Sequence, residues 1–154
     1  MPIQIGHKAP SFPVQSTAGD ISLDLAKGRN LVVFFYPKDN TPGCTIEAQQ
    51  YAELYEAFKT TNTEVVGVSR DSLKSHESFR EKLDLVFHLI ADTNEQFCTV
   101  FDVMRNKMMY GKQVRGLERS TFVFDKMNEL VREWRGVKVD GHAAEVLNFC
   151  KTLN

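Results

Sequence analysis

The positions of apolar residues along the chain predict a series of strands and helices. Residues 30–36 are apolar at almost every position, a pattern typical of a strand that is covered on both faces within a sheet. A helix is predicted after Thr41, which is expected to cap it, and it should run from Pro42 to about Lys59. Its inward stripe begins with Cys44, whose thiol is therefore expected to be semi-buried, and continues with Ala48, Tyr51, Tyr55 and Phe58.

The remaining elements also alternate between strand and helix, which is an α/β signature. Residues 12–15 and 21–23 predict an amino-terminal β-hairpin, and residues 120–124 and 130–134 predict a second one. The elements expected between them are a strand at 64–69, a helix at 72–82, a strand at 86–91 and a short helix at 94–101. Asp140 is expected to cap a last helix, whose inward stripe is Ala143, Val146, Leu147 and Cys150. We therefore predict an α/β fold with a mixed central sheet flanked by helices.

One stretch, residues 104–117, shows no clear period. It mixes basic residues with methionines and glycines, and neither the spacing of a helix nor that of a strand is evident. We interpret it as a functional or covering loop.

Size and charge narrow the class of protein. A chain of 154 residues, 42% of them apolar, can bury the core of one domain, so residues 1–154 are expected to form a single domain. The formal net charge of −1 lacks the excess of Lys and Arg that nucleic-acid binding needs. The longest apolar run, 31–36, is far shorter than the roughly 20 residues of a membrane span. The first residues do not resemble a secretory signal, so we expect a cytoplasmic protein that binds neither nucleic acid nor membrane.

The three cysteines, Cys44, Cys98 and Cys150, have no paired spacing, which argues against a disulfide framework or a zinc ribbon. Cys44 ends the segment 37–44, between a buried strand and the first turn of a helix. The partial positive charge and the free N–H groups of a helix amino terminus favour a thiolate there. Cys44 is thus a candidate nucleophile. The alternative is a small buried side chain that packs as alanine would.

Pro37, Thr41 and Cys44 fill the pattern Pro-x-x-x-Thr-x-x-Cys, which resembles the active-site signature of the peroxiredoxins. The wider wording, Phe-Tyr-Pro-Lys-Asp-Asn-Thr-Pro-Gly-Cys-Thr, is similar to the bacterioferritin comigratory protein, or peroxiredoxin Q, branch of that family. Segments 119–125 and 6–12 also resemble family segments, so the resemblance covers the whole domain. It implies a thioredoxin-like fold. It also implies an antioxidant oxidoreductase, a thiol-dependent peroxidase that reduces hydrogen peroxide and organic hydroperoxides.

The resemblance further implies roles for individual residues. Cys44 would be the peroxidatic cysteine, whose thiolate attacks the terminal peroxide oxygen and becomes a sulfenic acid. Thr41 stands where thioredoxins carry the first cysteine of their Cys-x-x-Cys motif, and its hydroxyl would hydrogen-bond the sulfur and the peroxide. Arg119 would stabilise the charge on the leaving oxygen, and Pro37 would keep water off the reactive intermediate. Glu47, one turn after Cys44, could orient Arg119 through a carboxylate–guanidinium pair, and the alternative is a glutamate on the solvated face of the helix.

The chain departs from its relatives at Gln49, a position where many members of the branch carry a resolving cysteine. Cys98 and Cys150 are interpreted as core residues. We therefore predict a one-cysteine cycle in which an external thiol, either thioredoxin or glutathione with glutaredoxin, reduces the sulfenic acid. The alternative, which stays open, is a disulfide between Cys44 and Cys98 or, less readily, between Cys44 and Cys150. The resemblance points to a monomer or a weak dimer.

No cofactor and no metal site is predicted, because the sequence shows no phosphate-binding loop and no haem or flavin motif. The histidines lack metal-ligand spacing and are interpreted as surface or core residues; they are His7, His76, His88 and His142. Two other function classes stay open: a thioredoxin-like thiol transferase that acts on protein disulfides, and a non-catalytic binding module with the thioredoxin fold. The joint presence of Thr41 and Arg119 speaks against both. Single-turnover consumption of peroxide would distinguish them.

Overall fold

The strand β3 (Asn30–Phe35) lies inside a seven-stranded sheet, and every one of its residues is buried. The computed structural model describes residues 2–153. β3 pairs in parallel with β4 (Thr63–Ser69) and antiparallel with β8 (Ser120–Phe124). A strand with two neighbours and two covered faces has no solvent-facing position, which explains the uninterrupted apolar sequence.

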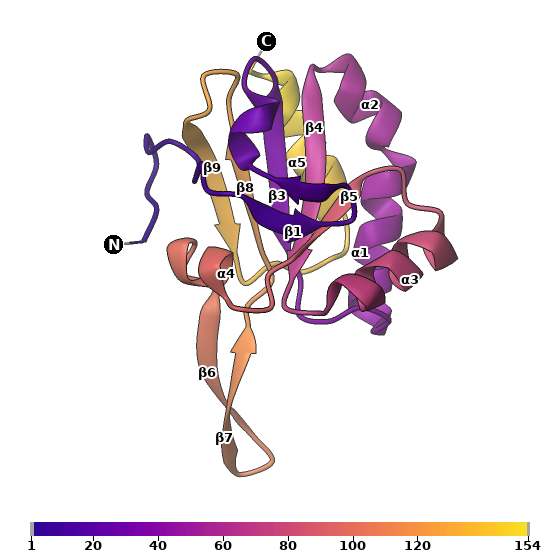
Figure 1. Cartoon of the computed structure of the whole chain (residues 1–154), viewed down its shortest axis with the longest axis vertical. Helices are drawn as coiled ribbons and strands as arrows, with labels where there is room; N and C mark the ends of the chain where they lie inside the picture. The colour runs from indigo at the N-terminus through magenta and orange to yellow at the C-terminus, as the bar shows by residue number, and fades with distance from the viewer. Residues whose placement is uncertain (1, 154) are drawn as a thin grey trace.

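The other strands extend the sheet on both sides, in the order β2-β1-β5-β4-β3-β8-β9 (Figure 1). β5 (His88–Ala91) is parallel to β4, and β9 (Leu130–Arg135) is antiparallel to β8. β1 (Val14–Ser16) and β2 (Gly19–Ile21) form a hairpin whose first strand pairs with β5. The predicted mixed sheet with an amino-terminal hairpin is therefore confirmed, although the hairpin strands lie closer to their turn than predicted.

Side chains along β3 alternate between two cores on opposite faces of the sheet. Leu31, Val33 and Phe35 belong to one core, and Val32 and Phe34 belong to the other. The first core is covered by the short 3-10 helix η1 (Leu23–Ala26) and by α4 (Gln96–Val100). The second is covered by α1 (Pro42–Glu53), α2 (Tyr55–Thr60), α3 (Leu73–Leu83) and α5 (His142–Lys151). Among the described residues, every helix is too short or too polar to cross a bilayer.

The single helix predicted from Pro42 to Lys59 is instead two helices. The break falls at Leu54, whose backbone angles (φ −94°, ψ 2°) leave the α-helical region. The inward stripe survives the break, because Cys44, Ala48, Tyr51 and Phe58 are all buried in one core. A short break at one residue leaves the apolar spacing on either side almost unchanged, so the pattern could not reveal it.

One predicted helix cap is confirmed in position only, and the other was wrong. Thr41 is the N-cap residue of α1, as predicted, but its hydroxyl does not bond an N–H group of the helix; it donates to the carbonyl oxygen of Lys38 at 2.7 Å. At α5 the residue before the first turn is Gly141, not Asp140. Its φ of 71° lies in the left-handed region, where glycine has no steric penalty and aspartate does.

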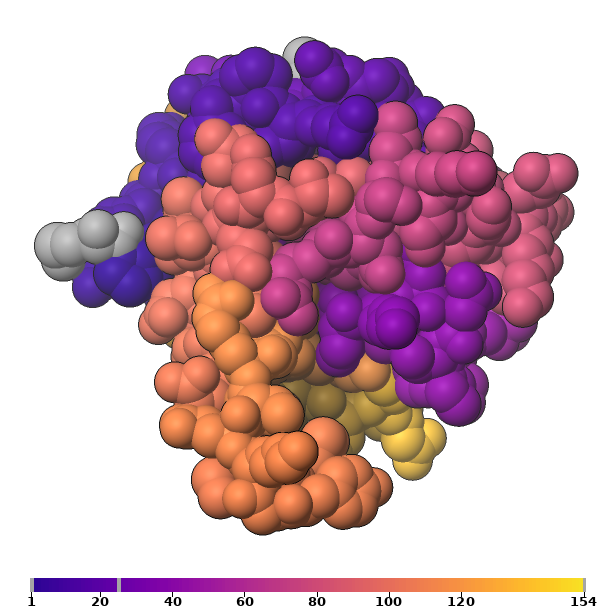
Figure 2. All heavy atoms as spheres, turned by 60° about the horizontal axis from the view of Figure 1, so that its bottom comes forward, coloured from indigo at the N-terminus to yellow at the C-terminus, as the bar shows by residue number. Residues whose placement is uncertain are grey.

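Residues 104–117 form a β-hairpin and not the predicted loop. β6 (Met104–Met109) pairs antiparallel with β7 (Lys112–Leu117) through a tight turn at Tyr110 and Gly111. The hairpin projects from the body in Figure 1, and its outer part stands clear of the surface in Figure 2. Most side chains on both of its faces are exposed, so no alternation of apolar and polar residues marked the two strands.

The register between β3 and β8 brings distant segments together. Phe35 at the end of β3 lies opposite Ser120 at the start of β8. The segment 37–44 follows β3 directly, and Arg119 directly precedes β8. These two parts of the sequence therefore meet at one end of the sheet.

Candidate active site

Cys44 lies in the first turn of α1, on the side that packs against the sheet. Only 1% of its surface is exposed, because its neighbours in the core include Ala48 and Tyr51. The thiol is thus buried more deeply than the semi-buried position that the sequence predicted. Thr41 is the N-cap residue, and Pro42 occupies the first turn, where its missing N–H costs nothing. The unpaired N–H groups and the dipole of this helix favour negative charge at its amino end.

Arg119 reaches Cys44 from the position just before β8. Its Nη2 donates a hydrogen bond to the Cys44 Sγ at 3.4 Å, and its Nη1 donates to the Glu47 Oε1 at 2.6 Å. Position 43 has little room for a side chain, since a Cβ on Gly43 would lie 3.2 Å from the Arg119 Nη2. The structure therefore brings Cys44, Glu47 and Arg119 together, with a guanidinium charge held against the sulfur.

Glu47 is almost completely buried beneath Arg119, with 1% of its side chain exposed. Burial raises the pKa of Glu47 to about 7, although the charge and hydrogen bond of Arg119 act in the opposite direction. The second carboxylate oxygen, Oε2, is buried without a hydrogen-bond partner among residues 2–153, which adds to the cost of ionisation. Burial also disfavours the charged form of Arg119, but Glu47 and Cys44 outweigh it and raise the pKa of Arg119. Glu47 is therefore the member of the pair that titrates near neutral pH.

Replacing Glu47 by glutamine is expected to change how stability depends on pH. The folded-state pKa of about 7 lies above the ordinary 4.5, so the folded protein holds this proton more tightly than the unfolded chain. The protonated Glu47 therefore adds to the free energy of unfolding below about pH 4.5, and this contribution is lost as the pH rises to about 7. The change is at most about 3 kcal/mol. Glutamine is nearly isosteric and stays neutral. The variant should match the parent at low pH and gain in unfolding free energy relative to it as the pH rises.

Urea denaturation of both proteins at about pH 4.5 and about pH 7.5 measures this difference. Asp39 does not disturb this comparison. Its pKa is lowered from 3.8, so the stability that it contributes changes only at pH values below those measured. A difference between variant and parent that stays constant over the range would contradict the prediction.

Thr41 and Pro37 lie on the loop that precedes α1. Thr41 is half-buried, and its hydroxyl proton is already donated to the Lys38 carbonyl oxygen. Its oxygen can therefore serve only as an acceptor for a further partner, such as the O–H of a peroxide. In the part of the chain that the structure describes, no hydrogen bond joins Thr41 to the Cys44 sulfur. Pro37 is exposed at the start of the loop.

The other two cysteines are buried away from Cys44. Cys98 belongs to the core on the opposite face of the sheet, where burial and the Asp92 carboxylate raise the pKa of its thiol. Cys150 shares the core of Cys44 but hydrogen-bonds Thr63 at the start of β4, the opposite end of the parallel strands. Burial raises the pKa of Cys150 to about 12. All three thiols are free, and neither Cys98 nor Cys150 lies beside Cys44.

The sequence does not reveal a second polar cluster, in which a residue of the same loop meets two residues in and just before α3. Asp39, Asp71 and His76 bring possible metal-ligating atoms within 4.8 Å of one another. The facing atoms of Asp39 and His76 already hydrogen-bond each other at 2.7 Å. Asp39 and His76 stand 37 positions apart, and polar residues in a loop and on a helix give no periodic signal. Only the fold brings them together.

Comparison with known proteins places the chain among characterised relatives. Residues 5–133 match the AhpC/TSA family. The whole chain is 42% identical to Peroxiredoxin Bcp of Bacillus subtilis, and the match covers 99% of that protein. The match therefore spans the whole chain, including the segment 37–44.

Two solved structures superpose closely on this one. A Cys-to-Ser variant of Xylella fastidiosa PrxQ has a TM-score of 0.93 at 40% identity, over 99% of this chain and 98% of that one. The bacterioferritin comigratory protein of Xanthomonas campestris, described for its alkyl peroxide reduction activity, has a TM-score of 0.88 at 44% identity, over 92% and 90%. The mixed sheet and its helices thus form the predicted thioredoxin-like fold.

Proposed function

Because this chain belongs to the AhpC/TSA family, in the Bcp/PrxQ branch of the peroxiredoxins, we propose that Cys44 is the thiol with which it reduces peroxides. The family membership makes the protein a thiol peroxidase. The observation that carries the assignment is the Arg119 guanidinium at 3.4 Å from the Cys44 sulfur, at the amino end of α1. The substrates are hydrogen peroxide and organic hydroperoxides, and the alkyl peroxide reduction described for the Xanthomonas relative supports the latter. Single-turnover consumption of peroxide by the reduced protein tests this proposal.

In the proposed reaction the Cys44 thiolate attacks the terminal oxygen of the hydroperoxide. The S–O bond forms as the O–O bond breaks, so sulfur is oxidised to a sulfenic acid and the peroxide is reduced. An alkoxide or hydroxide leaves and takes up the proton that the thiol gave up on ionising. Thiol and hydroperoxide thus become sulfenic acid and alcohol, or water when the substrate is hydrogen peroxide.

The neighbouring residues act on the charge that moves during this step. Negative charge passes from the sulfur to the leaving oxygen, and the fixed charge of Arg119 stands beside the line of transfer. Glu47 holds the guanidinium in place through its hydrogen bond of 2.6 Å. The Thr41 oxygen accepts a hydrogen bond from the peroxide O–H and aligns it. Pro37, at the start of the loop, limits the access of water to the sulfenic acid.

We propose a one-cysteine cycle for recycling. Cys98 is separated from Cys44 by the sheet, and Cys150 lies toward the other end of the same core. Gln49, at the position where many relatives carry a resolving cysteine, is an exposed amide. The sulfenic acid is therefore reduced by an external thiol, and thioredoxin or glutathione with glutaredoxin supplies it.

After oxidation by an equimolar amount of peroxide, the protein is expected to carry a sulfenic acid on Cys44 and no internal disulfide. Burial and distance keep the other two thiols away, so the acid should persist long enough to be trapped. Mass spectrometry should find a single dimedone adduct on the peptide that contains Cys44, and none in Cys44→Ser. Added glutathione should convert the acid to a mixed disulfide.

The opposite outcome is easy to recognise. A mass loss of two hydrogens, with the Cys44 peptide linked to that of Cys98 or Cys150, would replace the one-cysteine cycle by a two-cysteine one. Since native geometry holds these sulfurs apart, such a bond would also require local unfolding of α1.

A further inference from the structure

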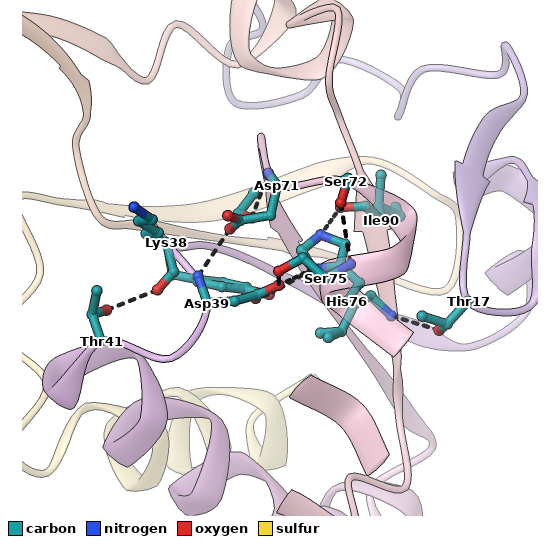
Figure 3. Close-up of polar contacts among 12 residues, drawn as sticks. Thr17, Lys38, Asp39, Thr41, Asp71, Ser72, Ser75, His76 and Ile90 are labelled. Carbon is teal, nitrogen blue, oxygen red and sulfur yellow. Dashed lines mark hydrogen bonds and ion pairs between the residues drawn. The ribbon is translucent and has the colours of Figure 1, made fainter. Parts of the chain in front are cut away.

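Asp39 anchors the loop between β3 and α1 through four contacts (Figure 3). Its Oδ1 accepts a hydrogen bond from the Tyr36 hydroxyl at 2.6 Å, and its Oδ2 accepts one from the Ser75 hydroxyl at 2.8 Å. The Nδ1 of His76 lies 2.7 Å from the same Oδ2. The backbone N–H of Asp39 donates to the Asp71 carboxylate at 2.9 Å. The loop is thereby fastened to α3 and to the turn before it.

His76 is buried and faces a hydrogen-bond acceptor with each ring nitrogen. Its Nε2 lies 2.9 Å from the carbonyl oxygen of Ile90, which can only accept. Its Nδ1 faces the Asp39 carboxylate. Although burial alone would raise the pKa of Asp39, the hydrogen bonds from His76 and Tyr36 lower it, so Asp39 is ionised. The ring of His76 thus bridges the Ile90 carbonyl and the Asp39 carboxylate through hydrogen bonds at its two nitrogens.

This pair connects the sheet to the residues that surround the sulfur. Ile90 lies in β5, His76 in α3, and Asp39 two residues before Thr41. The carbonyl of Lys38, next to Asp39, accepts the Thr41 hydroxyl hydrogen bond. Asn40, between Asp39 and Thr41, has a φ of 65°. This left-handed conformation costs free energy, which the surrounding contacts must offset. The anchors at Asp39 thus fix the backbone on which Thr41 and the first turn of α1 depend.

We infer that Asp39 and His76 are positioning residues for the peroxidase reaction, which set the direction of the Thr41 hydroxyl and the place of the Cys44 turn. Neither touches the sulfur, and both act through the backbone of residues 38–41. The inference rests on the proposed function of Cys44. A misplacement of about 1 Å at reacting groups can cost about a hundredfold in rate. Releasing the loop is accordingly expected to lower the second-order rate constant with peroxide about ten- to a hundredfold.

Two matched substitutions of His76 separate its two hydrogen bonds. Asparagine places an amide nitrogen close to the position of Nδ1 and can still donate to Asp39, whereas glutamine places one close to Nε2 and can still donate to Ile90. Each variant loses one of the two hydrogen bonds of the ring and leaves a buried polar group without its partner, so both should be less stable than the parent. Only His76→Gln releases the loop. We expect His76→Asn to keep the peroxide rate within about threefold and His76→Gln to lose tenfold or more.

Two further measurements distinguish positioning from general damage. Alkylation of Cys44 by iodoacetamide needs the thiolate but no aligned peroxide, so His76→Gln should alkylate as fast as the parent or faster. Phe124→Leu is the control for stability, since Phe124 is fully buried at the far end of β8 and should keep the parent rate.

The inference is overturned if His76→Gln reacts with peroxide as fast as the parent. It is also overturned if His76→Gln, His76→Asn and Phe124→Leu lose rate in proportion to their loss of stability, because this would show a merely structural role. Failure of the proposed function has a different signature. In that case the parent itself would not consume peroxide, or Cys44→Ser would consume it equally well.

Discussion

Cys44→Ser is expected to abolish the consumption of peroxide by the reduced protein. Serine keeps the shape of the side chain and its place in the first turn of α1, but its hydroxyl does not ionise near neutral pH and does not attack an O–O bond as a thiolate does. The parent should consume one equivalent of peroxide per chain in the absence of any reductant. Stopped-flow measurement of peroxide loss, with the variant as the matched comparison, measures the effect directly.

The other cysteines supply the control for this experiment. Cys98→Ala and Cys150→Ala should each retain the first turnover, because both thiols are buried and the pKa of each is raised by burial. Alanine is the better replacement at these positions, since a serine hydroxyl in an apolar core would need a hydrogen-bond partner. Peroxide consumption that survives in Cys44→Ser and disappears in either alanine variant would refute the assignment.

The elements that could be predicted from the sequence are those whose burial leaves a periodic trace. β3 is apolar throughout because both of its faces are covered. The apolar residues of α1 and α2 recur at helical spacing because one face of these helices packs on the sheet. The hairpin of β6 and β7 has no buried face and therefore no periodic pattern. The cap position at Thr41 was predicted correctly, but its hydrogen bond was not. Loop geometry decides whether the hydroxyl bonds the helix N–H groups or the Lys38 carbonyl, and residue spacing does not encode that geometry.

The residues of the candidate site also differ in whether the sequence alone could reveal them. Pro37, Thr41 and Cys44 stand close together in one motif, so they could be proposed without a structure. The burial of Glu47 could not be proposed in this way, because a glutamate on a helix normally faces solvent. Only the approach of Arg119, just before β8, makes a buried carboxylate tolerable. The Asp39–His76 pair is harder still. Its members belong to a loop and to a largely polar helix, and only the packing of α3 against β5, beside the loop that follows β3, brings the two side chains together.

Arg119→Ala is expected to lower the second-order rate constant with peroxide by about a hundred- to a thousandfold, or roughly 3 to 4 kcal/mol of transition-state stabilisation. The guanidinium lies 3.4 Å from the sulfur, so its charge acts on the negative charge as this passes to the leaving oxygen. The single variant has a second effect, because it leaves the buried Glu47 carboxyl without its partner. The double variant Glu47→Gln/Arg119→Ala removes this complication, and it should recover stability without recovering rate. Arg119→Lys keeps the charge but loses the paired geometry and should fall between parent and alanine. A folded double variant that reacts within a few-fold of the parent would show that the charge beside the sulfur does not act on the chemical step.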